Sequence, residues 1–107
     1  MLLVHTLSIT TAMALLVMTA PSGAATITIV MENLVIAPAE VSAKVGDTIE
    51  WVNKDVVAHT ATAQQGGDFD VMLPAKKNRS LVLNKAGTFP YYCRFHPNMK
   101  GVLKIAP

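Results

Sequence analysis

Short β-forming segments separated by turn residues constrain the fold of this chain more than any other feature of its sequence. From residue 26 onward, runs rich in Val, Ile, Thr and Tyr alternate with Gly, Asn, Asp and Pro, and no long stretch has helical periodicity. This pattern is typical of an all-β domain. The predicted strands are 26–31, 41–45, 48–52, 59–63, 80–83, 88–93 and 101–105.

The number of these segments favours two packed antiparallel sheets, because an open sheet would leave one apolar face in water. We therefore predict a Greek-key β-sandwich, with a small closed barrel as the alternative. In the segment 88–93, Phe89, Tyr91 and Cys93 point to one side. Pro90 has no backbone donor, which indicates either an edge position or a locally broken ladder.

Residues 1–25 have the pattern of an export signal. They contain no Asp, Glu, Lys or Arg, and an apolar run over residues 7–18, too short to span a bilayer, is followed by small residues. Gly23 and Ala25 suit cleavage after Ala25. We predict a signal peptide at 1–25 and a periplasmic domain at 26–107 that is not stably inserted in a membrane. An N-terminal apolar strand or anchor is the alternative.

Size, charge and cysteine content narrow the class of protein. A domain of about 82 residues has room for one modest core. All charged residues lie in it, and its formal charge of +2 is too small to indicate nucleic acid as a partner. Cys93 is the single cysteine, so no internal disulfide can form. An unpaired thiol in an oxidising compartment needs burial or a bound partner, and a metal ion supplies both.

Chemically distinctive residues concentrate in one segment near the C-terminus. Cys93, His96 and Met99 recur at every third position, which places a thiolate, an imidazole and a thioether on one loop. For these side chains to meet around one ion, the loop must fold back on itself, and Pro97 and Gly101 favour such a turn. Thiolate and thioether together suit copper, whereas calcium and magnesium require oxygen donors.

His59 is the only other histidine after residue 25. Two imidazoles and one thiolate with a weak axial thioether are the ligands of blue-copper electron-transfer sites. Zinc also accepts two His and one Cys, and is the alternative metal. Taken alone, His59, Cys93, His96 or Met99 would more simply be a residue of the core or the surface. Their occurrence together, with three of them at regular spacing on one loop, favours metal binding.

The region after residue 25 as a whole resembles a cupredoxin, the family of small blue copper proteins. The spacing Cys93-x-x-His96-x-x-Met99 is similar to the short ligand loop of the amicyanins, whereas plastocyanins and azurins have longer loops. The block 45–53 resembles the family's strand leading to the first ligand, and His59 follows it as the family pattern has it.

The resemblance implies that His59, Cys93 and His96 form an equatorial set with Met99 axial. It also implies that Asn53 lies behind these ligands and ties the His59 loop to the Cys93 loop, since residues behind the ligands orient them and tune the potential.

The sequence departs from the family pattern at three positions. Ala58 stands where a proline often precedes the first histidine, and Arg94 and Phe95 replace the more usual Thr-Pro after the cysteine. The absence of a hydroxyl at position 94 removes one partner for the side chain of Asn53.

These residues predict a monomeric one-electron carrier that cycles between Cu(I) and Cu(II) and is not an enzyme. The resemblance implies that His96 is the ligand nearest the surface, where redox partner proteins would dock briefly. A copper protein for delivery, storage or tolerance is the alternative. A copper enzyme would need an open coordination position or a second metal, and no unused histidine remains to build either.

Overall fold

A computed structural model describes residues 2–6, 8–14 and 23–107 of the chain. Its nine strands are β1 (Thr26–Glu32), β2 (Val35–Ala37), β3 (Glu40–Lys44), β4 (Thr48–Asn53), β5 (His59–Ala63), β6 (Asp70–Leu73), β7 (Asn78–Val82), β8 (Gly87–Tyr92) and β9 (Lys100–Ala106). The described residues form no helix, so none of them makes a membrane-spanning one. The prediction of an all-β domain is confirmed.

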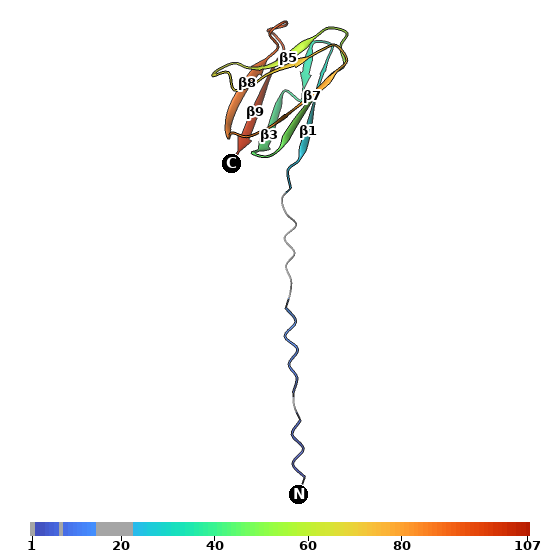
Figure 1. Cartoon of the computed structure of the whole chain (residues 1–107), viewed down its shortest axis with the longest axis vertical. Coiled ribbons are helices and arrows are strands. Elements are labelled where there is room, and N and C mark those ends of the chain that lie inside the picture. The colour runs from blue at the N-terminus through green and yellow to red at the C-terminus, as the bar shows by residue number, and fades with distance from the viewer. Residues whose placement is uncertain (1, 7, 15–22) are drawn as a thin grey trace.

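The strands form two packed sheets (Figure 1), one in the order β2-β1-β4-β7 and the other in the order β3-β9-β8-β5-β6. The predicted sandwich is confirmed, but both sheets are mixed, not purely antiparallel, because β1 runs parallel to β4 and β3 runs parallel to β9. After β2 the chain crosses to the second sheet for β3 and then returns for β4. A connection of this kind, unlike a tight hairpin, allows parallel neighbours.

Two of the strands have no counterpart in the sequence prediction. β2 contains three residues, too few to show an alternating pattern. β6 starts at Asp70 within a polar stretch, and only its last residue, Leu73, is buried. Both strands form through pairing with neighbours, β2 with β1 and β6 with β5.

Pro90 lies in a central strand, since β8 runs between β9 and β5. The edge position is therefore wrong, and the alternative of a locally broken ladder describes the structure. Val102 lies opposite Pro90 on β9 and donates its N–H away from β8, to the carbonyl of Ala39. Pro90 and Val102 are therefore a non-hydrogen-bonded pair, and the proline nitrogen faces β5. Beyond the pair Ala63 and Tyr91, the carbonyl of Pro90 still accepts from the N–H of Gln64 at 2.9 Å, but the proline has no N–H to return this bond, and the ladder ends there.

The core lies between the two sheets and is centred on an aromatic pair. Trp51 of β4 and Tyr91 of β8 come from different sheets, and their ring centroids lie 5.7 Å apart at an interplanar angle of 75°. Burial of each ring contributes about 5 kcal/mol of hydrophobic free energy. Trp51 Nε1 also donates to the Tyr91 hydroxyl at 3.3 Å. Burial raises the pKa of Tyr91 to about 12.

Asp47 anchors the start of β1 at the edge of the core, where it is 3% exposed. Its Oδ1 accepts from the backbone N–H of Ala25 at 2.9 Å and from Lys44 Nζ at 2.8 Å, and its Oδ2 accepts from the Lys44 N–H at 3.0 Å. The carbonyl of Ala25 accepts from the N–H of Thr48 at 2.8 Å. These hydrogen bonds lower the pKa of Asp47 to about 2, and the bond from Ala25 has the largest effect.

The predicted signal peptide at 1–25 lies partly outside the described residues. Its described parts are 2–6, 8–14 and 23–25, and none of them contains a strand. Residues 2–6 and 8–14 lie apart from the sandwich (Figure 1), whereas Ala25 is bound to it. Whether the segment is cleaved stays a prediction.

The candidate ligands gather at one end of the sandwich. His59 is the first residue of β5, and Cys93 directly follows β8. The loop from Cys93 to Met99 joins β8 to β9 at the end opposite the C-terminus (Figure 1). The sheet register thus brings residues that are 34 positions apart into contact.

Candidate metal centre

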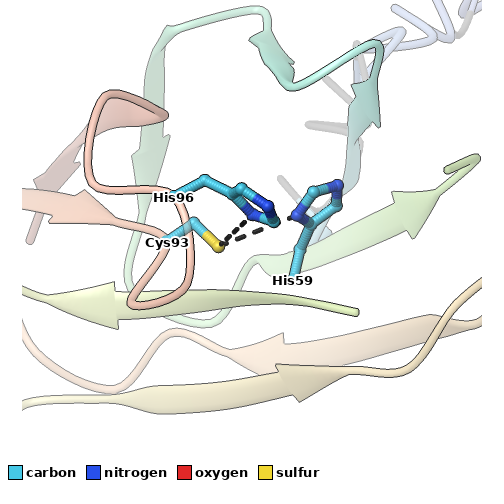
Figure 2. Close-up of side chains that lie close together, drawn as sticks. All are labelled: His59, Cys93 and His96. Carbon is cyan, nitrogen blue, oxygen red and sulfur yellow. Dashed lines mark hydrogen bonds between the residues drawn. The ribbon is translucent and has the colours of Figure 1, made fainter. Parts of the chain in front are cut away.

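His59, Cys93 and His96 form one compact group of potential ligands (Figure 2). One ligand atom from each lies within 4.8 Å of the others. The Cys93 Sγ atom is 3.7 Å from the Nδ1 atom of His59 and 3.7 Å from the Nδ1 atom of His96. The two imidazole rings lie edge to face, with centroids 5.0 Å apart.

These distances fit a single small metal ion between the three side chains. With bonds of about 2.0 Å to nitrogen and about 2.3 Å to sulfur, a trigonal angle separates the two outer atoms by about 3.7 Å. The Sγ to Nδ1 distances have this value for both histidines. Two neutral imidazoles and a thiolate are donors for a borderline or soft transition metal such as copper or zinc.

The ligand loop folds back on itself through three backbone hydrogen bonds. His96 N–H donates to the Cys93 carbonyl at 3.2 Å, Met99 N–H donates to the His96 carbonyl at 2.8 Å, and Cys93 N–H donates to the Met99 carbonyl at 3.0 Å. The predicted turn is thereby confirmed. Met99 is 3% exposed, so its side chain is held inside this end of the domain. Its role as a fourth ligand stays a prediction.

Asp55 orients the buried imidazole of His59. The Asp55 Oδ2 atom lies 2.7 Å from Nε2 of His59, which is itself fully buried. In the tautomer protonated at Nε2, the ring donates to the carboxylate and leaves the Nδ1 lone pair directed toward Cys93. This hydrogen bond is the main cause of a lowered pKa of Asp55.

Asn53 is buried, but the link to the Cys93 loop that the resemblance implied is wrong. Its Nδ2 atom donates to the carbonyls of Val57 at 2.9 Å, Leu73 at 3.1 Å and Pro74 at 3.2 Å. Asn53 therefore fastens the His59 loop to the connection after β6. With arginine at position 94, the loop after the cysteine offers no side-chain hydroxyl toward Asn53.

Thr60 makes the link between the two ligand loops. Its hydroxyl accepts from the N–H of Arg94 at 2.8 Å, and its own N–H donates to the Cys93 Sγ at 3.4 Å. Neither Thr60 nor Asp55 stands out in the sequence, because a threonine in a strand and an aspartate in a loop are common. The one available signal was their position relative to His59, since Thr60 directly follows it and Asp55 precedes it by four residues.

The two histidines differ in exposure. His59 is 0% exposed, whereas His96 is only partly buried. Near His96 in the chain, Phe95 is 47% exposed and Pro97 is exposed. On β6, Met72 is 45% exposed, whereas Leu73 belongs to the core.

Comparison with known proteins finds amicyanins. Amicyanin of Paracoccus denitrificans is 36% identical over 71 residues, which make up 62% of this chain and 54% of that protein. Amicyanin of Paracoccus versutus is 31% identical over 70 residues, which make up 58% of this chain and 51% of that protein. The matched part of the chain thus spans about half the length of these curated relatives.

Solved amicyanin structures share the architecture. The crystal structure of Paracoccus versutus amicyanin superposes with a TM-score of 0.67 at 27% identity, covering 81% of this chain and 85% of that one. The Cu(I) form of an amicyanin variant gives a TM-score of 0.67 at 27% identity, covering 75% and 81%.

The match to a family is broader than either comparison with individual proteins. Residues 4–105 match the model of the cupredoxin-like domain, which is nearly the whole sequence. The mixed-sheet sandwich and the group of two histidines and one cysteine agree with this match. The chain belongs to the cupredoxin-like family.

Proposed function

We propose that this protein is a type 1, or blue, copper protein that carries one electron at a time between redox partners. The observation that carries the proposal is the position of the Cys93 sulfur, 3.7 Å from one nitrogen of His59 and 3.7 Å from one nitrogen of His96. The Cu(I) form of a related amicyanin supports copper over zinc.

The proposed ligands are His59, Cys93, His96 and Met99. Copper bound by them would supply a centre that alternates between Cu(I) and Cu(II). The chain's own contribution is a fixed donor set. Cys93 is 0% exposed and its loop is closed by backbone hydrogen bonds, so the ligands need little movement when the charge at the site changes.

His96 is the proposed route for the electron, because it is the only partly exposed member of the three-residue group. Phe95 and Pro97 expose apolar surface beside it, and Arg94 and Lys100 are exposed near the same loop. Such a surface suits brief docking, since exposed charges contribute little lasting affinity. We propose that the protein acts as a monomer toward protein partners and has no enzymatic activity of its own.

Export to the periplasm is part of the same proposal. It rests on the uncharged apolar segment at 1–25 and on the single cysteine, Cys93, which a bound metal would protect from oxidation.

The test is the visible spectrum of the purified protein after addition of Cu(II). An intense blue colour from thiolate-to-copper charge transfer is expected, and Cys93→Ala should abolish it. Met99→Ala should keep the colour and shift the reduction potential. A colourless protein that binds Zn²⁺ with higher affinity would overturn the copper assignment.

Voltammetry and metal exchange separate an electron carrier from a copper delivery, storage or tolerance protein. A carrier gives a reversible one-electron couple and keeps its copper in the presence of a chelator. An irreversible couple with rapid loss of copper would favour the handling role, because delivery requires the metal to leave.

A further inference from the structure

We propose that Thr60, Thr62 and Asp70 form a positioning chain that fixes the backbone at Cys93 and thereby tunes the copper thiolate. The part of the proposal that concerns copper rests on the proposed function. The part that concerns the backbone holds for the protein with or without metal.

The hydrogen bonds of this chain run in one direction. The Thr60 hydroxyl accepts from the N–H of Arg94 at 2.8 Å, and the Thr60 and Thr62 hydroxyl oxygens are 2.9 Å apart. Thr62 donates to Asp70 Oδ1 at 2.7 Å. Because Thr62 has a single hydrogen and gives it to Asp70, the hydrogen between the two threonines comes from Thr60. The chain therefore leads from the Arg94 amide to a carboxylate.

The sheet register brings these residues together. Thr62 lies opposite Asp70 in the β5–β6 pair and opposite Tyr92 in the β5–β8 pair. Two residues earlier on β5, Thr60 reaches the level of Arg94, just beyond the end of β8. The same strand thus contacts the ligand loop on one side and Asp70 on the other.

Arg94 closes the chain into a ring. Its Nε atom lies 3.3 Å from the same Asp70 oxygen that accepts from Thr62. The side chains of Arg94 and Asp70 are 39% and 53% exposed, so this ion pair by itself adds little stability. Its effect is to hold an ionised carboxylate at the end of the chain, and the Thr62 and Arg94 hydrogen bonds both lower the pKa of Asp70.

Thr60 holds Cys93 from two sides. Its N–H donates to the cysteine sulfur at 3.4 Å, while its hydroxyl fixes the peptide that follows the cysteine. Thr60 is 0% exposed, so water cannot replace the hydroxyl as a partner. Hydrogen bonds to a ligand sulfur withdraw electron density and favour the reduced metal, which makes their geometry a determinant of the potential.

The experiment compares Thr60→Val, Thr62→Val and Asp70→Asn with the unaltered full chain. Thr60→Ser keeps the hydroxyl and should behave as the unaltered protein. Thr28→Val, which removes an exposed hydroxyl from β1 in the other sheet, is the matched control.

The first measurement is hydrogen exchange of the Arg94 amide in the metal-free protein. Thr60→Val should accelerate this exchange roughly tenfold relative to the amides of β8, as expected for the loss of one buried hydrogen bond. Thr62→Val should give a smaller increase in the exchange rate, and Asp70→Asn the smallest. Exchange of the Arg94 amide that changes no more than that of β8 in all three variants would overturn the proposal.

The second measurement is the ratio of Cu(I) to Cu(II) at a fixed applied potential. Thr60→Val should lower this ratio several-fold, because a less ordered N–H contact leaves more electron density on sulfur. An unchanged ratio would overturn the tuning role. If the unaltered protein fails to turn blue with Cu(II), the proposed function fails, and the exchange measurement still decides whether the positioning chain exists.

Discussion

The carboxylate of Asp55 lies 2.7 Å from Nε2 of His59, on the ring nitrogen that does not face Cys93. The same carboxylate accepts from the backbone N–H groups of Asn33 at 2.7 Å and Leu34 at 3.1 Å. These two residues form the β1–β2 turn and have left-handed φ values of 55° and 61°. One side chain therefore connects a strained turn to the buried imidazole of His59.

Replacement of Asp55 should weaken metal binding. In Asp55→Ala the His59 ring loses the partner that fixes its tautomer, and we expect metal affinity to fall about 10–100-fold. Competition with a chelator of known affinity measures the change. Asp68→Asn removes a carboxylate that pairs with Lys85 in another loop and should leave the affinity unaltered. Equal affinities of Asp55→Ala and the unaltered protein would refute the orienting role.

Asp47 should make stability depend on acid pH. Its pKa falls from 3.8 to about 2 on folding, so its contribution is complete above pH 3.8 and disappears as the pH drops toward 2. Urea unfolding at several pH values should show the free energy of unfolding decreasing through this window. Asp47→Asn should be less stable at neutral pH and show a shallower decrease. A slope identical to that of the unaltered protein would contradict the assignment.

A side chain at Gly101 should destabilise the protein. A Cβ atom built there would lie 2.5 Å from the ring of Tyr91, which is opposite it on β8 and fully buried. Gly101→Ala should therefore cost about 1–3 kcal/mol of unfolding free energy through overpacking. Denaturant unfolding measures this cost. Lys104→Ala, exposed on the same strand, should change stability by less than about 0.5 kcal/mol. Equal stability of the two variants would show that the Tyr91 ring can move away.

Tyr91 should respond to alkaline pH. Its pKa is raised from 10.0 to about 12 because burial opposes ionisation, so its contribution to stability is complete below pH 10 and is lost as the pH rises toward 12. In Tyr91→Phe this dependence should vanish. The variant should also lose about 1–3 kcal/mol at neutral pH, since the buried Trp51 N–H then has no acceptor. Difference measurements against the unaltered protein at pH 9 and pH 11 separate this effect from lysine titration.

The sequence predicted the sandwich and the grouping of His59, Cys93 and His96 because both depend on strong local patterns. Alternation along β4 and β8 indicated which residues face the core, and the spacing of Cys93 and His96 marked the loop. The parallel pairs were not predictable, since their register arises from contacts between distant segments. Within the site, the contacts of Asn53 and Thr60 depend on which residue stands opposite them, and a single sequence does not contain this information.

If the predicted leader is removed, the contact between Ala25 and Asp47 depends on the point of cleavage. Removal of a leader after Ala25 would delete both the donor to this buried carboxylate and the carbonyl that pairs with Thr48. Removal after Ala24 would instead leave a free ammonium group at Ala25, within reach of the Asp47 oxygen 2.9 Å from that nitrogen. Two cuts one residue apart would thus give domains with different contacts at Asp47.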